Sequence, residues 1–106
     1  MDRLSYFKSL LDKSPDNPMV HYSLAQEYYK IKEYDKAVEH LKRYLELHED
    51  EGAAYRILAK CYEEMGEFSK AVEALEEGIK QAMKFNHPSM AQEYSQWIEE
   101  IKGMAF

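Results

Sequence analysis

The run Lys36-Ala37-Val38-Glu39 decides the fold, because it returns unchanged 34 residues later as Lys70-Ala71-Val72-Glu73. The surrounding apolar and aromatic positions repeat with the same period, in the pairs Leu24/Leu58, Ala25/Ala59, Tyr28/Tyr62, Tyr34/Phe68, Leu41/Leu75 and Leu45/Ile79. A fixed period of this length means that one supersecondary unit is stacked on copies of itself. The sequence therefore predicts a repeat architecture, which builds a surface rather than a catalytic pocket.

Each repeat is predicted to be a pair of helices. In the first copy Val20, Leu24 and Tyr28 follow helical spacing, with Asn17 as a cap and Pro18 in the first helical position. The link to the next helix is about three residues long, and so short a link makes the two helices antiparallel neighbours. We predict six helices, over residues 2–13, 18–31, 35–47, 52–65, 68–85 and 88–102.

The chain is predicted to form a single domain, because a chain of 106 residues can bury one core but not two. Leu4, Phe7, Leu10 and Leu11 lie 34 residues before Val38, Leu41, Tyr44 and Leu45, which indicates a leading half repeat. The predicted parts of domain 1–106 are the half repeat 1–17, the full repeats 18–51 and 52–85, and a capping helix with a tail, 86–106. The last four residues are expected to fray.

The last helix has two unlike faces, which favours a cap. Its apolar face carries Met90, Tyr94, Trp97, Ile98 and Ile101, and its polar face carries Gln92, Glu93, Gln96, Glu99 and Glu100. The end of a helical array needs such a polar outer side. We expect Tyr94 and Trp97 to pack on the preceding helix around Leu75 and Ile79. Gly78, inside that helix, indicates a close approach between helices.

The second copy resembles the tetratricopeptide repeat, in the ordered positions Tyr55, Leu58-Ala59, Tyr62, Gly66, Phe68, Ala71 and Leu75. The resemblance covers roughly residues 1–85. The first copy departs from the pattern at His21, Lys32 and Glu49, where a large aromatic, a turn glycine and a proline are usual. Lys32 would then adopt a left-handed backbone conformation. The resemblance implies an all-α fold, a right-handed α-α superhelix of about six antiparallel helices, and a non-enzymatic scaffold for protein–protein interaction.

Composition and charge restrict the function. The chain holds 20 acidic and 14 basic residues, and this surplus of acid argues against a general nucleic-acid binder. Cys61 is the only cysteine, so there is no internal disulfide and no cysteine-based zinc site, which fits a reducing compartment. No signal peptide is evident, and no stretch approaches the ~18 apolar residues of a membrane span, so we expect a cytoplasmic protein.

No pattern typical of catalysis, metal binding or cofactor binding is present. Of the four histidines, His40 lies seven residues from Glu33 and eight from His48, so no close pair of metal ligands is predicted. The turn from His48 to Glu51 is interpreted as a surface cluster, His21 is expected in a helix seam, and His87 is expected to cap the last helix. There is no Gly-x-Ser-x-Gly motif and no glycine-rich phosphate loop, and a buried Cys61 would be inert.

The predicted binding site is the groove lined by the first helix of each pair. Residues 19, 22, 26 and 29 form one stripe, residues 53, 56, 60 and 63 form the same stripe one repeat later, and Lys30 lies near the edge. The candidate partner-binding residues are Met19, Tyr22, Gln26, Tyr29, Lys30, Arg56, Lys60 and Glu63. Two bases facing two aromatic rings suit an extended peptide or protein segment with an acidic or C-terminal carboxylate group. The carboxylate clamp of some relatives is not carried over, since the first stripe has no Lys/Asn pair.

Two alternatives remain open at this point. Arg56 and Lys60 could instead pair with local acids such as Glu27, Glu63 and Glu64, and only keep the groove soluble. The main contact could also be with a second copy of the chain, through the uncovered face of the half repeat near Tyr6 or through the tail with Met104 and Phe106. The expected state is then a monomer or a weak homodimer.

Overall fold

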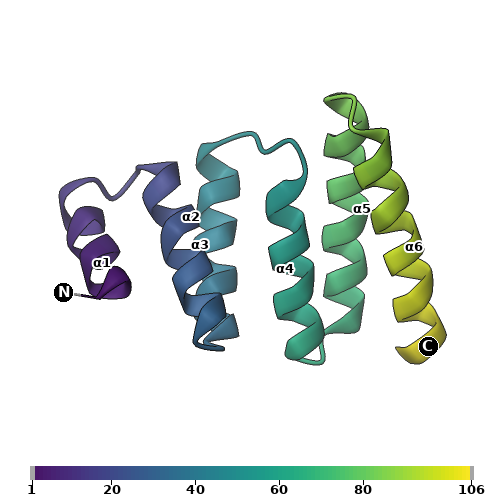
Figure 1. Cartoon of the computed structure of the whole chain (residues 1–106), viewed down its shortest axis with the longest axis horizontal. Helices are drawn as coiled ribbons and strands as arrows, with labels where there is room; N and C mark the ends of the chain where they lie inside the picture. The colour runs from purple at the N-terminus through teal and green to yellow at the C-terminus, as the bar shows by residue number, and fades with distance from the viewer. Residues whose placement is uncertain (1, 106) are drawn as a thin grey trace. The chain divides into compact units, whose positions relative to one another are not determined.

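The computed structural model describes residues 2–105, which form six helices and no strand (Figure 1). The helices are α1 (Arg3–Lys13), α2 (Pro18–Lys30), α3 (Tyr34–Leu47), α4 (Ala53–Glu64), α5 (Phe68–Lys84) and α6 (Pro88–Ala105). The predicted all-α class is confirmed, and every helix end except the last lies within one residue of its predicted position.

The last helix is longer than predicted. It continues to Ala105, so Gly103 and Met104, which were expected to fray, are helical. Lys102 lies in its last turn, where a positive charge interacts favourably with the helix dipole. Met1 and Phe106, the ends of the predicted half repeat and tail, lie outside the described residues.

The chain divides into two compact units, with the boundary between Glu49 and Asp50. In the N-terminal unit α2 pairs with α3, and α1 packs on α2. In the C-terminal unit α4 pairs with α5, and α6 packs on α5. The boundary lies close to the predicted junction of the two full repeats.

Caps and turns define the helix ends. The Asn17 side chain accepts a hydrogen bond of 3.0 Å from the backbone N–H of Met19, with Pro18 at the first helical position, as predicted. Lys32 and Gly66 occupy equivalent positions in the two turns and both have positive φ angles, 63° and 75°. The left-handed conformation predicted for Lys32 is therefore confirmed, at a position where glycine avoids the steric cost of a side chain.

Small residues fill the centre of both helix pairs. Ala25 and Ala37 in the N-terminal unit, and Ala59 and Ala71 in the C-terminal unit, are completely buried. Larger side chains surround them, with Leu24, Leu41 and Leu75 fully enclosed. Each unit therefore has a packed apolar core between antiparallel helices.

Gly78 is the place where α6 approaches α5, as its position within a helix predicted. A β-carbon built there would lie 2.8 Å from the Tyr94 ring and 2.9 Å from the β-carbon of Tyr55. The Tyr94 side chain is completely buried, and its hydroxyl donates a 2.8 Å hydrogen bond to the carbonyl of Gly52 at the start of α4. One ring thus connects α6 to both other helices of the C-terminal unit.

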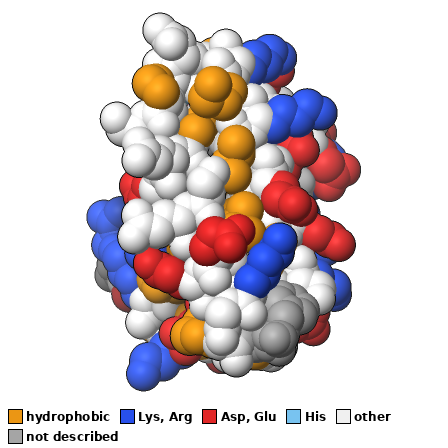
Figure 2. Space-filling view, turned by 90° about the vertical axis from the view of Figure 1, so that its right-hand side faces the viewer, with side chains coloured by type: hydrophobic (Ala, Val, Ile, Leu, Met, Phe, Trp, Pro, Cys, Tyr) orange, Lys and Arg blue, Asp and Glu red, His pale blue; other side chains and the backbone are white. Residues whose placement is uncertain are grey.

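The two unlike faces predicted for α6 are present. Ala91, Tyr94, Ile98 and Ile101 are buried, whereas Gln92, Gln96 and Glu99 are exposed. Figure 2 shows the molecule from the side of α6, where hydrophobic side chains form a narrow, broken line among polar and charged ones.

Trp97 differs from its predicted role. The Tyr94 ring lies against α5 as expected, but the Trp97 indole N–H donates a 2.8 Å hydrogen bond to Glu63 of α4. Its ring meets Tyr94 edge-on, with centroids 6.4 Å apart, and stays partly exposed. The indole is directed toward α4 because its polar N–H finds a carboxylate there.

Helix α1 is less covered than its counterparts. It contains no buried residue, and Leu4, Phe7, Leu10 and Leu11 are only partly buried. Of the equivalent residues of α3, Val38, Leu41 and Tyr44 are buried, and Leu45 is partly buried. This difference is what the prediction of a half repeat requires.

We predict that ending the chain after His87 destabilises the C-terminal unit. The truncation removes the buried Tyr94 and Ile101 side chains and uncovers the face of α5 around Gly78. Burial of each large apolar side chain contributes about 1.5–3 kcal/mol, so the melting temperature should fall and the protein should aggregate. An unchanged thermal unfolding curve would show that α6 is not a cap.

We predict that Gly78→Ala is destabilising although alanine is the better helix former. The added methyl group would overlap the Tyr94 ring and the Tyr55 β-carbon. Overpacking costs about 1–3 kcal/mol, more than the ~1 kcal/mol of helix propensity gained. Gly103→Ala is the matched control, because nothing lies within 4 Å of a β-carbon there. Chemical denaturation should show a lower midpoint for the first variant and an equal or higher one for the second.

Candidate functional site

A hollow opens between α4 and α6 of the C-terminal unit. Its volume is about 420 Å³, and it is lined by Arg56, Lys60, Glu93, Gln96, Trp97 and Glu100. Two of the residues predicted for the groove, Arg56 and Lys60, line it from α4, and a third, Glu63, holds the Trp97 indole. The α6 side of the hollow belongs to the helix that the sequence identified only as a cap.

Arg56 is partly exposed, and contacts with α6 hold its side chain in place. Its guanidinium forms a two-pronged ion pair with Glu93, with N–O distances of 3.0 to 3.2 Å, and lies 5.4 Å from the centre of the Tyr94 ring. Arg56 therefore does pair with an acid, as the alternative interpretation held, but the partner is Glu93 of α6 and not Glu27, Glu63 or Glu64. The prediction had no means of placing α6 beside α4.

Trp97 forms a fixed aromatic wall of the hollow. The hydrogen bond from its indole N–H to Glu63 and its edge contact with Tyr94 restrain the ring from two sides. Sequence reasoning missed Trp97 as a site residue. The available signal was its position one helical turn after Glu93, because residues four apart in a helix are neighbours.

Of the two basic side chains that line the hollow, Lys60 is the one that remains available to a ligand. It is exposed, and among the described residues no carboxylate pairs with it. Residues 50–106 hold only 6 basic residues against 11 acidic ones, so two bases in one hollow depart from the local surplus of acid. Gln96 and Glu100 are exposed on the opposite side.

The other predicted groove residues lie on α2 in the N-terminal unit. Met19 and Gln26 are exposed, whereas Tyr22 and Tyr29 are partly buried. The Tyr22 ring packs on Tyr44 at 4.8 Å between centroids, and the Tyr29 ring meets Tyr34 edge-on at 5.8 Å. The two tyrosines therefore have part of their surface committed to α3.

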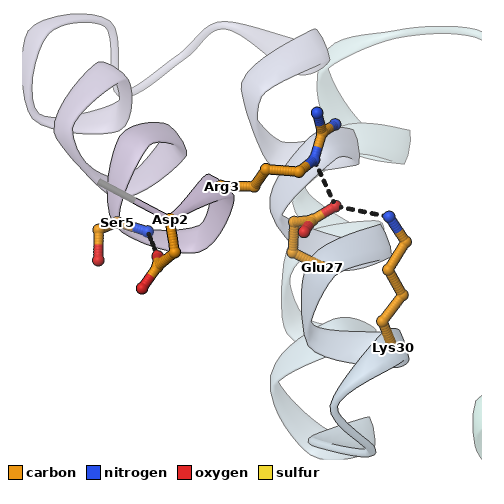
Figure 3. A network of polar contacts seen from close by, with 5 residues as sticks. All are labelled: Asp2, Arg3, Ser5, Glu27 and Lys30. Carbon is orange, nitrogen blue, oxygen red and sulfur yellow. Dashed lines mark hydrogen bonds and ion pairs between the residues drawn. The ribbon is translucent and has the colours of Figure 1, made fainter.

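Lys30 belongs to a charge network that connects α1 and α2 (Figure 3). The Glu27 carboxylate lies 3.0 Å from the Lys30 ammonium and 3.2 Å from the Arg3 guanidinium, and the Glu27 side chain is only 12% exposed. The hydrogen bond from Lys30, followed by that from Arg3, lowers the pKa of Glu27. Asp2 in the same view caps α1 through the backbone N–H of Ser5.

The histidines are arranged differently from the prediction. His21 lies buried in the seam between α2 and α3, as expected, but there it meets His40, with 3.0 Å between their Nδ1 atoms. These two histidines are 19 residues apart in the chain, so the spacing of close ligand pairs did not predict their contact. Among the described residues, no group of three or more His, Cys, Asp or Glu side chains could hold a metal ion.

His87 and Cys61 both make contacts that belong to the fold and not to a reactive site. The His87 ring lies 2.7 Å from Glu51, and its backbone carbonyl accepts from Ala91 N in the first turn of α6. Cys61 is completely buried, and burial, with a smaller effect of Glu64, raises its thiol pKa to about 11. The thiol is therefore protonated at neutral pH and is no nucleophile. No described helix is long and apolar enough to cross a membrane.

Comparison with known proteins places this arrangement in a family. The solution structure of protein BPP2914 from Bordetella parapertussis superimposes with a TM-score of 0.82 at 19% sequence identity, over 98% of this chain and 90% of that one. No curated protein matches the chain. The model of the tetratricopeptide repeat family matches residues 4–57 and 32–92, which together span most of the sequence. The chain belongs to the tetratricopeptide repeat family.

Proposed function

We propose that this protein is a peptide-binding module that holds its partner in the hollow between α4 and α6. Tetratricopeptide repeats are in general protein–protein interaction modules and are generally not enzymes. The finer proposal is that one partner segment, with a carboxylate and an apolar side chain, binds to the C-terminal unit. We propose no catalytic activity and no cofactor.

A single observation supports the site: Lys60 stands exposed beside an indole ring that α4 and α6 hold in place. A restrained aromatic ring offers apolar contact area at a low cost in entropy. A hollow of about 420 Å³ is near the lower end of the ~300–1,000 Å³ of small-ligand sites. It fits one or two side chains of a peptide.

The charges around the hollow narrow the partner chemistry. Arg56 already has Glu93 as its partner, so Lys60 offers the charge for one carboxylate. Glu100 on the opposite side would repel a second acid. The fitting ligand is therefore a segment with one carboxylate, either an acidic side chain or the chain end, next to an apolar residue, rather than a run of acids.

We propose that the exposed residues of α2 form a separate contact surface on the N-terminal unit. Met19 and Gln26 offer an apolar and an amide contact to a partner, and Tyr22 and Tyr29 offer ring edges. Lys30 contributes less, since its ammonium is already shared with Glu27.

The binding site can be tested with the fluorescence of Trp97, the only tryptophan of the chain. Short peptides ending in an apolar residue with a free carboxylate, and the same peptides amidated, are titrated into the protein. We expect the free-acid peptides to shift the emission. Lys60→Glu should lower the affinity for the free-acid peptides about tenfold or more, since a charge-assisted hydrogen bond contributes about 1.5–3 kcal/mol.

Lys80→Glu is the matched control, because it makes the same charge change on an exposed residue of α5, outside the hollow. Arg56 is a poorer choice, since its substitution breaks a contact between α4 and α6. Equal affinities of the Lys60→Glu and Lys80→Glu variants would place binding elsewhere. If amidated peptides bind as well as the free acids, the site does not recognise the peptide carboxylate.

Self-association is the second candidate function. Its support is the exposure of α1, which has no buried residue and presents Tyr6 at 51% exposure. Met104 near the other end is 69% exposed. Apolar side chains left uncovered in this way are typical of contact surfaces between proteins.

Sedimentation velocity at low micromolar concentration distinguishes this candidate from the first. We expect a monomer or a weak dimer, and any dimer should dissociate when Tyr6→Glu or Met104→Glu places a charge at the contact. A stable dimer that both variants leave intact would show that neither end forms the interface.

A further inference from the structure

His21 of α2 and His40 of α3 form a ring-to-ring contact in the N-terminal unit. Their Nδ1 atoms are 3.0 Å apart, and Nε2 of His21 lies 2.7 Å from the carbonyl oxygen of Pro15 in the link between α1 and α2. The residues 34 positions later are Tyr55 and Ala74. The C-terminal unit therefore lacks an equivalent pair.

The partners decide where the protons lie. A carbonyl oxygen can only accept, so Nε2 of His21 carries the proton that points to Pro15. In a neutral His21 the Nδ1 atom is then bare and accepts a hydrogen bond from His40. His40 must donate through Nδ1–H, which leaves its own Nε2 without a proton.

The arrangement accepts one further proton but not two. A proton added at Nε2 of His40 leaves the Nδ1–H to Nδ1 hydrogen bond intact. A second proton, at Nδ1 of His21, would set two N–H groups against each other across 3.0 Å. Neither N–H could then donate to the other ring, and like charges would face each other where His21 is buried and His40 is partly buried.

The surroundings give little support to a charged pair. His21 is only 6% exposed, and the His40 ring stacks on Tyr28 with planes 9° apart. Lys8 of α1 and Lys36 of α3 both place their ammonium groups within 6.0 Å of the same Tyr28 ring.

The acidic groups nearby do little to stabilise a positive charge on the histidine pair. Glu39 on α3 is the carboxylate that favours a charged His40, and it is exposed. Asp16 in the link is engaged by Arg43, which also pairs with Glu46. Burial first, and then His21, lowers the pKa of His40.

We propose that the His21–His40 pair is an acid-sensitive latch of the N-terminal unit: uptake of protons below neutral pH parts the two rings and loosens α3 from α2, while the C-terminal unit keeps its packing. Because His21 also holds the Pro15 carbonyl, loosening the seam weakens the support of the link to α1. The latch regulates how well formed the N-terminal unit is, and it does not depend on the peptide site proposed above.

The direction of the pH effect follows from proton linkage. His40 binds its proton more weakly in the folded unit than in the unfolded chain, so acid favours unfolding. The contribution of neutral His40 to the stability of the folded unit is fully present above the ordinary histidine pKa of 6.5. It is lost progressively as the pH falls from there to the lowered pKa of the folded state, below which this residue adds no further loss.

Nitrogen-15 spectra of the histidine rings in the full chain test the arrangement directly. At about pH 8, where histidine is neutral, we expect His21 to carry its proton on Nε2 and His40 on Nδ1. On acidification His40 should gain a proton at Nε2, and the signals of α2 and α3 should broaden or shift. An Nε2–H tautomer of His40, or acidification that leaves the signals of α2 and α3 unchanged, would overturn the proposal.

Amide hydrogen exchange tests the selectivity of the latch. From about pH 8 to about pH 5, protection factors of α2 and α3, corrected for intrinsic rates, should fall severalfold more than those of α4 and α5. His40→Gln should abolish this difference, because an amide N–H can still donate to His21 but does not titrate. His48→Gln, which removes an exposed histidine of the same unit, should retain it. An equal loss in both units, or an unchanged loss in His40→Gln, would overturn the proposal.

Discussion

The close crossing of paired helices is the constraint on which this structure depends. Where α2 pairs with α3 and α4 with α5, the central positions are alanines with no exposed surface. A methyl group is about the largest side chain that allows such an approach, and the short turns at Lys32 and Gly66 keep the partners antiparallel. The small residues that this close crossing requires recur in the sequence with the 34-residue period.

The same constraint positions the candidate site. Gly78 removes even a methyl group from α5, and the Tyr94 ring fills the space and reaches Gly52. With Tyr94 fixed, Glu93 and Trp97 are carried to the side of α6 that meets Arg56 and Glu63 of α4. The polar lining of the hollow is therefore a consequence of apolar packing behind it.

The two units use charge in different ways. In the N-terminal unit, the Glu27 carboxylate forms ion pairs with both Arg3 and Lys30, so these three charges are paired within the protein. In the C-terminal unit, the pairing of Arg56 with Glu93 leaves Lys60 on the rim of the hollow. Departures from the repeat, such as His21 in place of an aromatic residue, create features that only one unit has.

The sequence by itself determined the helices, their order and the family, because these follow from the spacing of apolar residues, from caps such as Asn17, and from turns that tolerate positive φ. It also predicted the close approach at Gly78. Only the tertiary structure decided that Arg56 meets Glu93, that Trp97 turns toward Glu63, and that His21 meets His40. These pairs lie 19 to 37 residues apart in the chain. Side-chain periodicity identifies the face of a helix on which a residue lies, but which residue of another helix it meets depends on the register of packed helices, which no local pattern contains.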